Sequence, residues 1–278
     1  MTKNAFISSP NTETFSVLGV TVHNVSFSEV RQFVVDTISG SEFRHIVTIN
    51  PDLIMMAQRN PEFLDALNRA DLTTIDGVGI YLPAILQKKN LKGRVSGSDL
   101  FEIILEVAEE TSTPIFLLVN QRGLSTFHDM SLLVKKRFPN IELFGYDVDT
   151  VSVAEIESGL EKARCFPIVL SNFGGALQEI SLAKLRTLSR TKVRLVVGVG
   201  GAFDFFTGKQ KRAPFLVRRF GFEWLWRFIL QPRRRLRRTW EYVFVYSILC
   251  FREAFASAYR SPKKTSPPLR TFHRNIPS

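Results

Sequence analysis

Two short segments of the 278-residue chain place polar or acidic side chains directly after apolar, β-branched runs. Thr48 and Asn50 close one run before Pro51, and Asp76 follows another run and precedes Gly77-Val78-Gly79. Ligands bind at the carboxyl ends of strands in open α/β sheets, so these residues are predicted to face a crevice. A carboxylate at such an edge can accept a proton from a hydroxyl, which makes Asp76 the candidate general base. The alternative is that Asp76 caps a helix.

Two glycine-rich turns follow other apolar runs. In the segment 198–204, Phe203 stands where a GxGxxG fingerprint needs a small residue, so the sequence gives little support to a nicotinamide or flavin site. A glycine turn of this kind still lets the backbone approach a phosphate. The second turn, Gly174-Gly175, precedes Gln178 and Glu179, which could hydrogen-bond a uracil or a ribose. A plain helix start accounts for the same residues.

Metal-binding patterns are weak. Asp147-Val148-Asp149 has the form of a DxD triplet, but no third carboxylate nearby completes a site for a hard cation. The four histidines form no HExxH motif, and Cys165 and Cys250 fit neither a disulfide framework nor a zinc site. No metal and no cofactor is therefore expected. The low cysteine content fits a reducing cytoplasm.

The segments that must position these residues alternate between apolar runs and stretches of helical periodicity. This alternation, from about residue 15 to residue 194, predicts an α/β fold with a Rossmann-like, mostly parallel sheet flanked by helices. The capping-box spacing of Ser26 with Glu29, and of Ser152 with Glu155, predicts two helix starts. The predicted strands are 45–50, 72–75, 114–119, 141–146, 167–171 and 193–198.

The formal net charge of +11 is concentrated toward the C-terminal part of the chain. Five arginines between 233 and 238 lie among Trp, Tyr and Phe, a composition typical of helices that rest on an anionic membrane surface. The nearly uncharged stretch 242–251 is too short to span a bilayer, which needs roughly 20 residues. A docking helix with a solvated basic face is the alternative. The predicted organisation is a disordered lead-in (1–15), an α/β catalytic domain (16–208), a helical basic and aromatic appendage (209–260) and a disordered tail (261–278).

Taken in order, these segments resemble the WecG/TagA/CpsF family of glycosyltransferases from about Val17 to Arg238. The resemblance rests on Thr48 and Asn50, Ala70-Asp71-Leu72 with Asp76-Gly77-Val78-Gly79, Arg94-Val95-Ser96-Gly97-Ser98-Asp99-Leu100, Gly175-Ala176-Leu177-Gln178-Glu179, Gly198-Val199-Gly200-Gly201-Ala202-Phe203-Asp204 with Gly208, Lys211-Arg212-Ala213-Pro214, and Gly221-Phe222-Glu223-Trp224 with Arg227 and Pro232. One departure is the residue before Gln178. The family commonly has a lysine there and this chain has Leu177, which removes one donor contact and allows a different donor sugar.

The resemblance implies an inverting, metal-independent hexosyltransferase. The donor would be a UDP-sugar of the N-acetylmannosamine, N-acetylmannosaminuronic acid or glucose class, and the acceptor a polyprenyl-diphosphate-linked sugar of a cell-surface or exopolysaccharide pathway. Asp76 would be the base, with Thr48 as a second catalytic candidate. The implied substrate-binding residues are Asn50, Arg94, Gln178, Gly175, Gly200, Asp204, Arg227, Arg234 and Arg237. The appendage arginines would neutralise the charge of the departing diphosphate where no metal does so.

Two other kinds of function fit part of the sequence. A nucleic-acid-binding protein could use the arginines and aromatic residues for phosphate contact and base stacking, but Asp76 and the glycine turns would then have no role. A non-catalytic lipid-binding protein could retain the fold. The expected partners are a UDP-sugar, a lipid-linked acceptor and an anionic membrane, with no nucleic acid, at the cytoplasmic face of the inner or plasma membrane. Self-association stays open because no heptad pattern is present.

Overall fold

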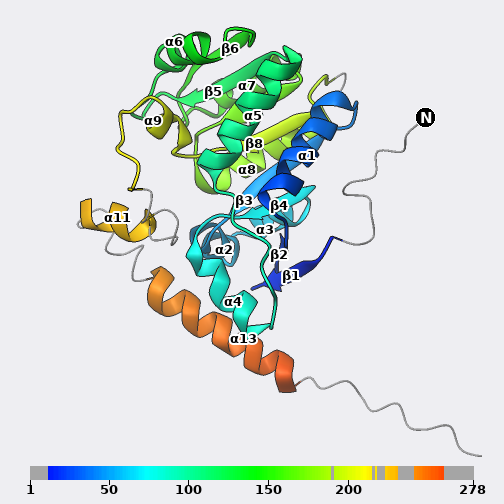
Figure 1. Ribbon diagram of the computed structural model, residues 1–278, viewed down its shortest axis with the longest axis vertical. Coiled ribbons are helices and arrows are strands. Elements are labelled where there is room, and N and C mark those ends of the chain that lie inside the picture. The colour runs from blue at the N-terminus through cyan, green and yellow to red at the C-terminus, as the bar shows by residue number, and fades with distance from the viewer. Residues whose placement is uncertain (1–11, 189–190, 215–216, 218–222, 231–240, 260–278) are drawn as a thin grey trace, which may run out of the picture.

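The computed structural model describes residues 12–188, 191–214, 217, 223–230 and 241–259 (Figure 1). Its centre is a six-stranded sheet in the order β4-β3-β8-β7-β5-β6, in which every neighbouring pair is parallel. The strands are β3 (Arg44–Ile49), β4 (Leu72–Ile75), β5 (Ile115–Asn120), β6 (Leu143–Val148), β7 (Ile168–Ser171) and β8 (Leu195–Gly198). These are the six predicted strands, with no boundary displaced by more than two residues. The predicted α/β fold with a parallel sheet is confirmed.

Helices cover both faces of this sheet, which is why its strands read as continuous apolar runs rather than alternating ones. Every residue of β4, β7 and β8 is buried. The helices that share a hydrophobic cluster on one face are α1 (Phe27–Ser39), α5 (Gly97–Thr111), α6 (Phe127–Arg137) and α9 (Ala202–Phe206). Those on the opposite face are α2 (Pro51–Ala57), α3 (Pro61–Asn68), α7 (Val153–Ala163) and α8 (Gly175–Lys184), the last continued by the 3-10 turn η2 (Leu185–Thr187).

Local capping fixes where the helices begin. The Ser26 hydroxyl accepts a hydrogen bond from the backbone N–H of Glu29, whose carboxylate accepts one from the Ser26 N–H, so the predicted capping box of α1 is confirmed. Ser152 caps α7 through the N–H of Glu155, which confirms the second predicted start. Two further capping boxes, which were not predicted, open α5 with Ser96 and α6 with Thr126.

A two-stranded antiparallel hairpin, β1 (Thr14–Val17) and β2 (Val20–His23), precedes the sheet and was not predicted. Its turn residues Leu18 and Gly19 have φ angles of 50° and 80°, the left-handed values that tight hairpin turns require. The hairpin packs in the same hydrophobic cluster as α2 and α3. The predicted lead-in therefore overlaps β1 at its end, and its residues 1–11 lie outside the described residues.

The described part of the C-terminal appendage starts with an irregular segment (209–214) and contains the helical elements α11 (Glu223–Leu230), the π-helical turn η3 (Glu241–Tyr246) and α13 (Ser247–Tyr259). Tyr246 and Cys250 are buried in the cluster that also holds the β1–β2 hairpin, and burial raises the pKa of Cys250 to about 11. In Figure 1, α13 runs beside α4 (Tyr81–Leu86), and the two helices are in contact. No helix in the described part of the chain is long and apolar enough to cross a membrane. The predicted tail lies outside the described residues.

Candidate active site

The predicted sugar-pocket residues lie at the ends of two adjacent strands. Thr48 pairs in register with Thr74, and the backbone N–H of Asp76 donates to the carbonyl of Ile49 at 2.8 Å. Asn50 and Asp76 therefore leave β3 and β4 side by side at the carboxyl edge of the sheet. Both are partly exposed, whereas Thr48 is buried. The prediction that these strand ends meet at one edge is confirmed.

The turn after Asp76 is shaped by its glycines. Gly77, at φ 94°, occupies the N-cap position of the 3-10 turn η1 (Val78–Ile80), so Asp76 is not the N-cap residue there. A Cβ atom added to Gly79 would lie 2.3 Å from Cγ of Pro51, the first residue of α2. The turn can thus pass against α2 only with glycine at position 79. This close approach keeps Asp76 beside Asn50, the residue that precedes α2.

A third segment, the start of α5, lies against Thr48. A Cβ atom added to Gly97 would lie 3.5 Å from the Thr48 hydroxyl oxygen and 3.2 Å from the carbonyl oxygen of Val199 after β8. The N–H of Val95 donates to the carbonyl of Ile75 at 3.0 Å, which brings the preceding residue, Arg94, to the end of β4. The structure thus gathers four of the predicted segments at one edge of the sheet.

The predicted Asn50 contact with a sugar is constrained by the fold. The Asn50 side-chain oxygen accepts a hydrogen bond from the N–H of Leu53 at 3.0 Å and so caps α2. Its amide nitrogen is the part of the side chain that can donate to a sugar hydroxyl. The cap also fixes the orientation of that amide at the sheet edge.

The predicted donor contact Gln178 lies inside the protein, with 4% of its surface exposed. Its oxygen accepts a hydrogen bond from the N–H of Gly174 at 3.1 Å, and its nitrogen donates to Glu179 at 2.7 Å. Glu179 in turn contacts Nε2 of His45 at 2.9 Å. Neither His45 nor its pairing with Glu179 was predicted. Gly175, at φ 58°, lies in the turn above this buried chain.

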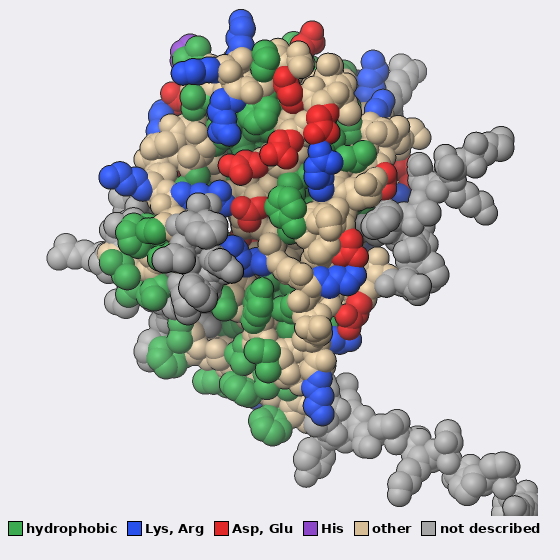
Figure 2. Space-filling view, viewed as in Figure 1, with side chains coloured by type: hydrophobic (Ala, Val, Ile, Leu, Met, Phe, Trp, Pro, Cys, Tyr) green, Lys and Arg blue, Asp and Glu red, His purple; other side chains and the backbone are tan. Residues whose placement is uncertain are grey.

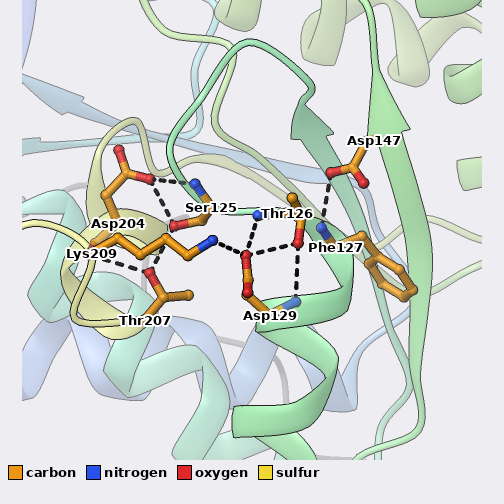
Figure 3. A network of polar contacts seen from close by, with 8 residues as sticks. All are labelled: Ser125, Thr126, Phe127, Asp129, Asp147, Asp204, Thr207 and Lys209. Carbon is orange, nitrogen blue, oxygen red and sulfur yellow. Dashed lines mark hydrogen bonds and ion pairs between the residues drawn. The ribbon is translucent and has the colours of Figure 1, made fainter.

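Asp204, predicted to bind substrate, ties helix α9 to the loop that precedes α6 (Figure 3). Its carboxylate accepts from the N–H and the hydroxyl of Ser125, at 3.1 and 2.7 Å, and that hydroxyl lies 2.7 Å from the hydroxyl of Thr207. Beside this group, Lys209 forms an ion pair with Asp129, and the resulting hydrogen bond holds the pKa of Asp129 well below its usual range. Gly200, at φ 50°, borders open space, since nothing lies within 4 Å of an added Cβ. That space fits the predicted close approach of a ligand to the backbone.

Both aspartates of the DxD triplet make contacts within the fold. Asp147 accepts a hydrogen bond from the N–H of Phe127 at 2.8 Å (Figure 3), and Asp149 forms an ion pair with Arg122 at 3.0 Å. Within the described ranges, no group of three or more His, Cys, Asp or Glu side chains could hold a metal ion. The expectation of a metal-free site stays a prediction.

The side chains of the three arginines assigned to the leaving group lie outside the part of the chain that the structure describes. Arg227 belongs to α11 without a described side chain, and Arg234 and Arg237 lie outside the described residues. A different arginine, Arg212, contacts Asp99 at 2.7 Å at the start of α5. Burial raises the pKa of Asp99, but hydrogen bonds from Ser96 and Arg212 outweigh it, so the pKa is lowered overall. Only the Lys211–Pro214 block of the family resemblance pointed to Arg212.

The carboxyl edge of an open parallel sheet is where ligands bind in such folds, and here it gathers an acid, a hydroxyl, an amide and glycine turns. The chain matches the model of the glycosyl transferase WecG/TagA/CpsF family over residues 15–260. It belongs to this family, and the resemblance predicted from the sequence is confirmed.

Three relatives carry the same name, N-acetylglucosaminyldiphosphoundecaprenol N-acetyl-beta-D-mannosaminyltransferase. The protein of Bacillus spizizenii strain W23 is 33% identical, over 68% of this chain and 72% of its own length. That of Bacillus subtilis strain 168 is 30% identical over the same shares of the two chains. The protein of Staphylococcus aureus strain MRSA252 is 26% identical over 86% of this chain and 93% of its own.

Proposed function

We propose that this glycosyltransferase moves N-acetylmannosamine from a UDP-linked donor to N-acetylglucosaminyl-diphosphoundecaprenol during the assembly of a cell-surface polymer. The names of the three relatives support this choice of sugar and acceptor. The observation that carries the proposal is the position of Asp76, a carboxylate at the end of β4 beside Asn50 and close to the Thr48 segment.

In the proposed reaction, an acceptor hydroxyl attacks the anomeric carbon of the donor while Asp76 takes its proton. The bond between the anomeric carbon and the UDP oxygen breaks, UDP leaves with the electron pair, and the configuration inverts. Thr48 and Asn50 would orient the sugar, and Arg94 would contact the donor. The charge that develops on UDP requires positive groups, for which we propose Arg227, Arg234 and Arg237 in place of a metal.

This function predicts which donor is used and whether a metal is needed. With a short-chain polyprenyl-diphosphate N-acetylglucosamine acceptor, UDP-N-acetylmannosamine is expected to be used at least about tenfold faster than UDP-N-acetylmannosaminuronic acid or UDP-glucose, a difference of at least about 1.4 kcal/mol in the barrier. Mass spectrometry of the product measures the transfer, and NMR gives its anomeric configuration. EDTA is expected to leave the rate unchanged. Loss of transfer in EDTA that Mg²⁺ or Mn²⁺ restores would contradict the metal-free mechanism.

The outer side of η3 and α13 supports a membrane as the second partner. Phe244, Ile248, Phe251 and Phe255 recur at helical spacing and are exposed, whereas Tyr246 and Cys250 face the core. Figure 2 shows hydrophobic side chains gathered over the region that α11 and α13 occupy in Figure 1. A stripe of this kind can be buried at the headgroup boundary of a bilayer. We propose peripheral binding at the cytoplasmic face, where the lipid-linked acceptor would be within reach.

The membrane proposal predicts that charges on the stripe weaken vesicle binding. The double variant Phe251→Glu/Phe255→Glu is expected to bind phosphatidylglycerol-containing vesicles at least about tenfold more weakly, since each buried phenylalanine contributes about 1.5–3 kcal/mol. Co-sedimentation measures this affinity. The control is Leu132→Glu on α6, where a leucine is similarly exposed outside the stripe. Equal binding by both variants would place the membrane contact elsewhere.

A further inference from the structure

Beneath the Gly174–Gly175 turn, three polar side chains form a buried chain of hydrogen bonds. His45, Glu179 and Gln178 are only 2%, 1% and 4% exposed, and they come from β3 and α8. The contacts run from His45 Nε2 to Glu179 at 2.9 Å, from Gln178 Nε2 to Glu179 at 2.7 Å, and from the Gly174 N–H to Gln178 Oε1 at 3.1 Å. Leaving any of these groups unsatisfied would be costly at such burial.

The hydrogen bonds fix the orientation of the Gln178 amide. The backbone N–H of Gly174, the residue before α8, can only donate, so Gln178 turns its Oε1 toward it and its Nε2 toward Glu179. The Glu179 oxygen that accepts from Nε2 holds the amide in this orientation and, through it, the turn in its position.

The turn held in this way lies at the edge of the sheet where the site is built. Gly174 and Gly175 have φ angles of 82° and 58°, and a Cβ atom added to Gly175 would lie 3.0 Å from the methyl carbon of Met56 on α2. Helix α2 begins directly after Asn50. The buried chain therefore reaches from the inside of β3 to a glycine turn that packs on α2, the helix that Asn50 caps.

We propose that His45, Glu179 and Gln178 are positioning residues, which hold the Gly174–Gly175 turn in the conformation that binds the nucleotide-sugar donor. Gln178 then acts through the turn and does not touch the donor. This inference rests on the proposed function, because it assigns the turn to the donor site. The end of β8 supports it: a Cβ atom added to Gly198 would lie 1.9 Å from Gln178 Nε2 and 2.3 Å from Glu179 Oε1. Because residue 198 is glycine, the side chains of Gln178 and Glu179 have room beside the end of β8.

The test compares two substitutions of Glu179. Glu179→Met fills a similar volume but makes neither hydrogen bond, and it is expected to raise the donor KM about tenfold, as for the loss of one hydrogen bond that orders the turn. The kcat value is expected to stay within about threefold, because Asp76 is unchanged. Glu179→Gln is the matched control. It can still accept from Gln178 and donate to His45 if the imidazole changes tautomer, so its donor KM should stay within about twofold of wild type.

A double variant separates a positioning role from direct contact. If Gln178 and Glu179 act as one unit, Gln178→Met/Glu179→Met raises the donor KM no further than either single variant. If the increases in donor KM of the two single variants multiplied in the double variant, Gln178 would touch the donor itself, which would overturn the proposal. Hydrogen exchange of the peptide containing Gly174 is expected to quicken in both single variants, and unchanged exchange would also overturn it.

Failure of the positioning role and failure of the proposed function give different results. If wild-type protein transfers no sugar from any donor, the proposed function is wrong; if wild type transfers and Glu179→Met keeps the wild-type donor KM, only the positioning role is wrong. Should Glu179→Met fail to fold, Gly198→Ala displaces the same two side chains without removing either. It is expected to raise the donor KM about tenfold as well, and an unchanged KM there would overturn the proposal.

Discussion

Replacing Asp76 by asparagine is expected to lower kcat for sugar transfer by about 10²- to 10⁴-fold, the contribution typical of a general base. The substitution keeps the size of the side chain and removes only the carboxylate that would take the acceptor proton. The donor KM is expected to change by less than about threefold, because the loss falls in the transition state. Initial rates with labelled donor and short-chain acceptor measure both constants.

The matched control is Asp149→Asn, which makes the same chemical change at the carboxyl end of β6. Asp149 is paired with Arg122, and its pKa is lowered by hydrogen bonds from the Val151 backbone and from Arg122, as expected of a carboxylate with a structural task. Transfer by this variant should stay within about twofold of wild type. If Asp76→Asn retained wild-type kcat at an unchanged melting temperature, Asp76 would not be the base and a non-catalytic role for this edge would return.

The strands of the central sheet could be predicted from the sequence because both faces of that sheet are buried. Runs such as β8 are apolar throughout because both faces are covered, and all six strands of the sheet were found. The β1–β2 hairpin was missed although its strands alternate buried with more exposed positions, because β1 begins inside the polar stretch that was expected to be a disordered lead-in. Its turn at Leu18-Gly19 also lacks the Asn-Gly or Asp-Gly pair that most strongly signals a hairpin.

Only those parts of the candidate site that lie at strand ends could be predicted from the sequence. Asn50 and Asp76 each follow a recognisable strand, and parallel pairing brings them together. The partners that orient other site residues are remote in sequence: Glu179 lies 134 positions from His45, and Arg212 lies 113 positions from Asp99. Local spacing carries no information on such pairs. For the same reason Gln178 was expected to face the donor, although the folded chain turns both ends of its amide inward.

Replacing Tyr246 by alanine is expected to lower the free energy of unfolding by about 3–5 kcal/mol, the usual cost of deleting a large buried aromatic ring. Tyr246 is 2% exposed and lies among the largest fully buried side chains of the described residues. It joins η3 to the cluster that holds Ile75 and Ile80, on either side of the Asp76 turn. Urea denaturation of the variant and of wild type measures the difference.

Tyr246→Phe separates packing from the hydrogen bond. It keeps the ring and loses the hydrogen bonds of the hydroxyl, to the Gly79 carbonyl at 3.3 Å and to Cys250, so a cost of about 1–2 kcal/mol is expected. An alanine variant as stable as wild type would mean that η3 and α13 do not pack on the core in solution. The expected difference bears on the site as well: η3 and the residues on either side of the Asp76 turn share one core cluster, so loss of the Tyr246 ring is expected to loosen that turn.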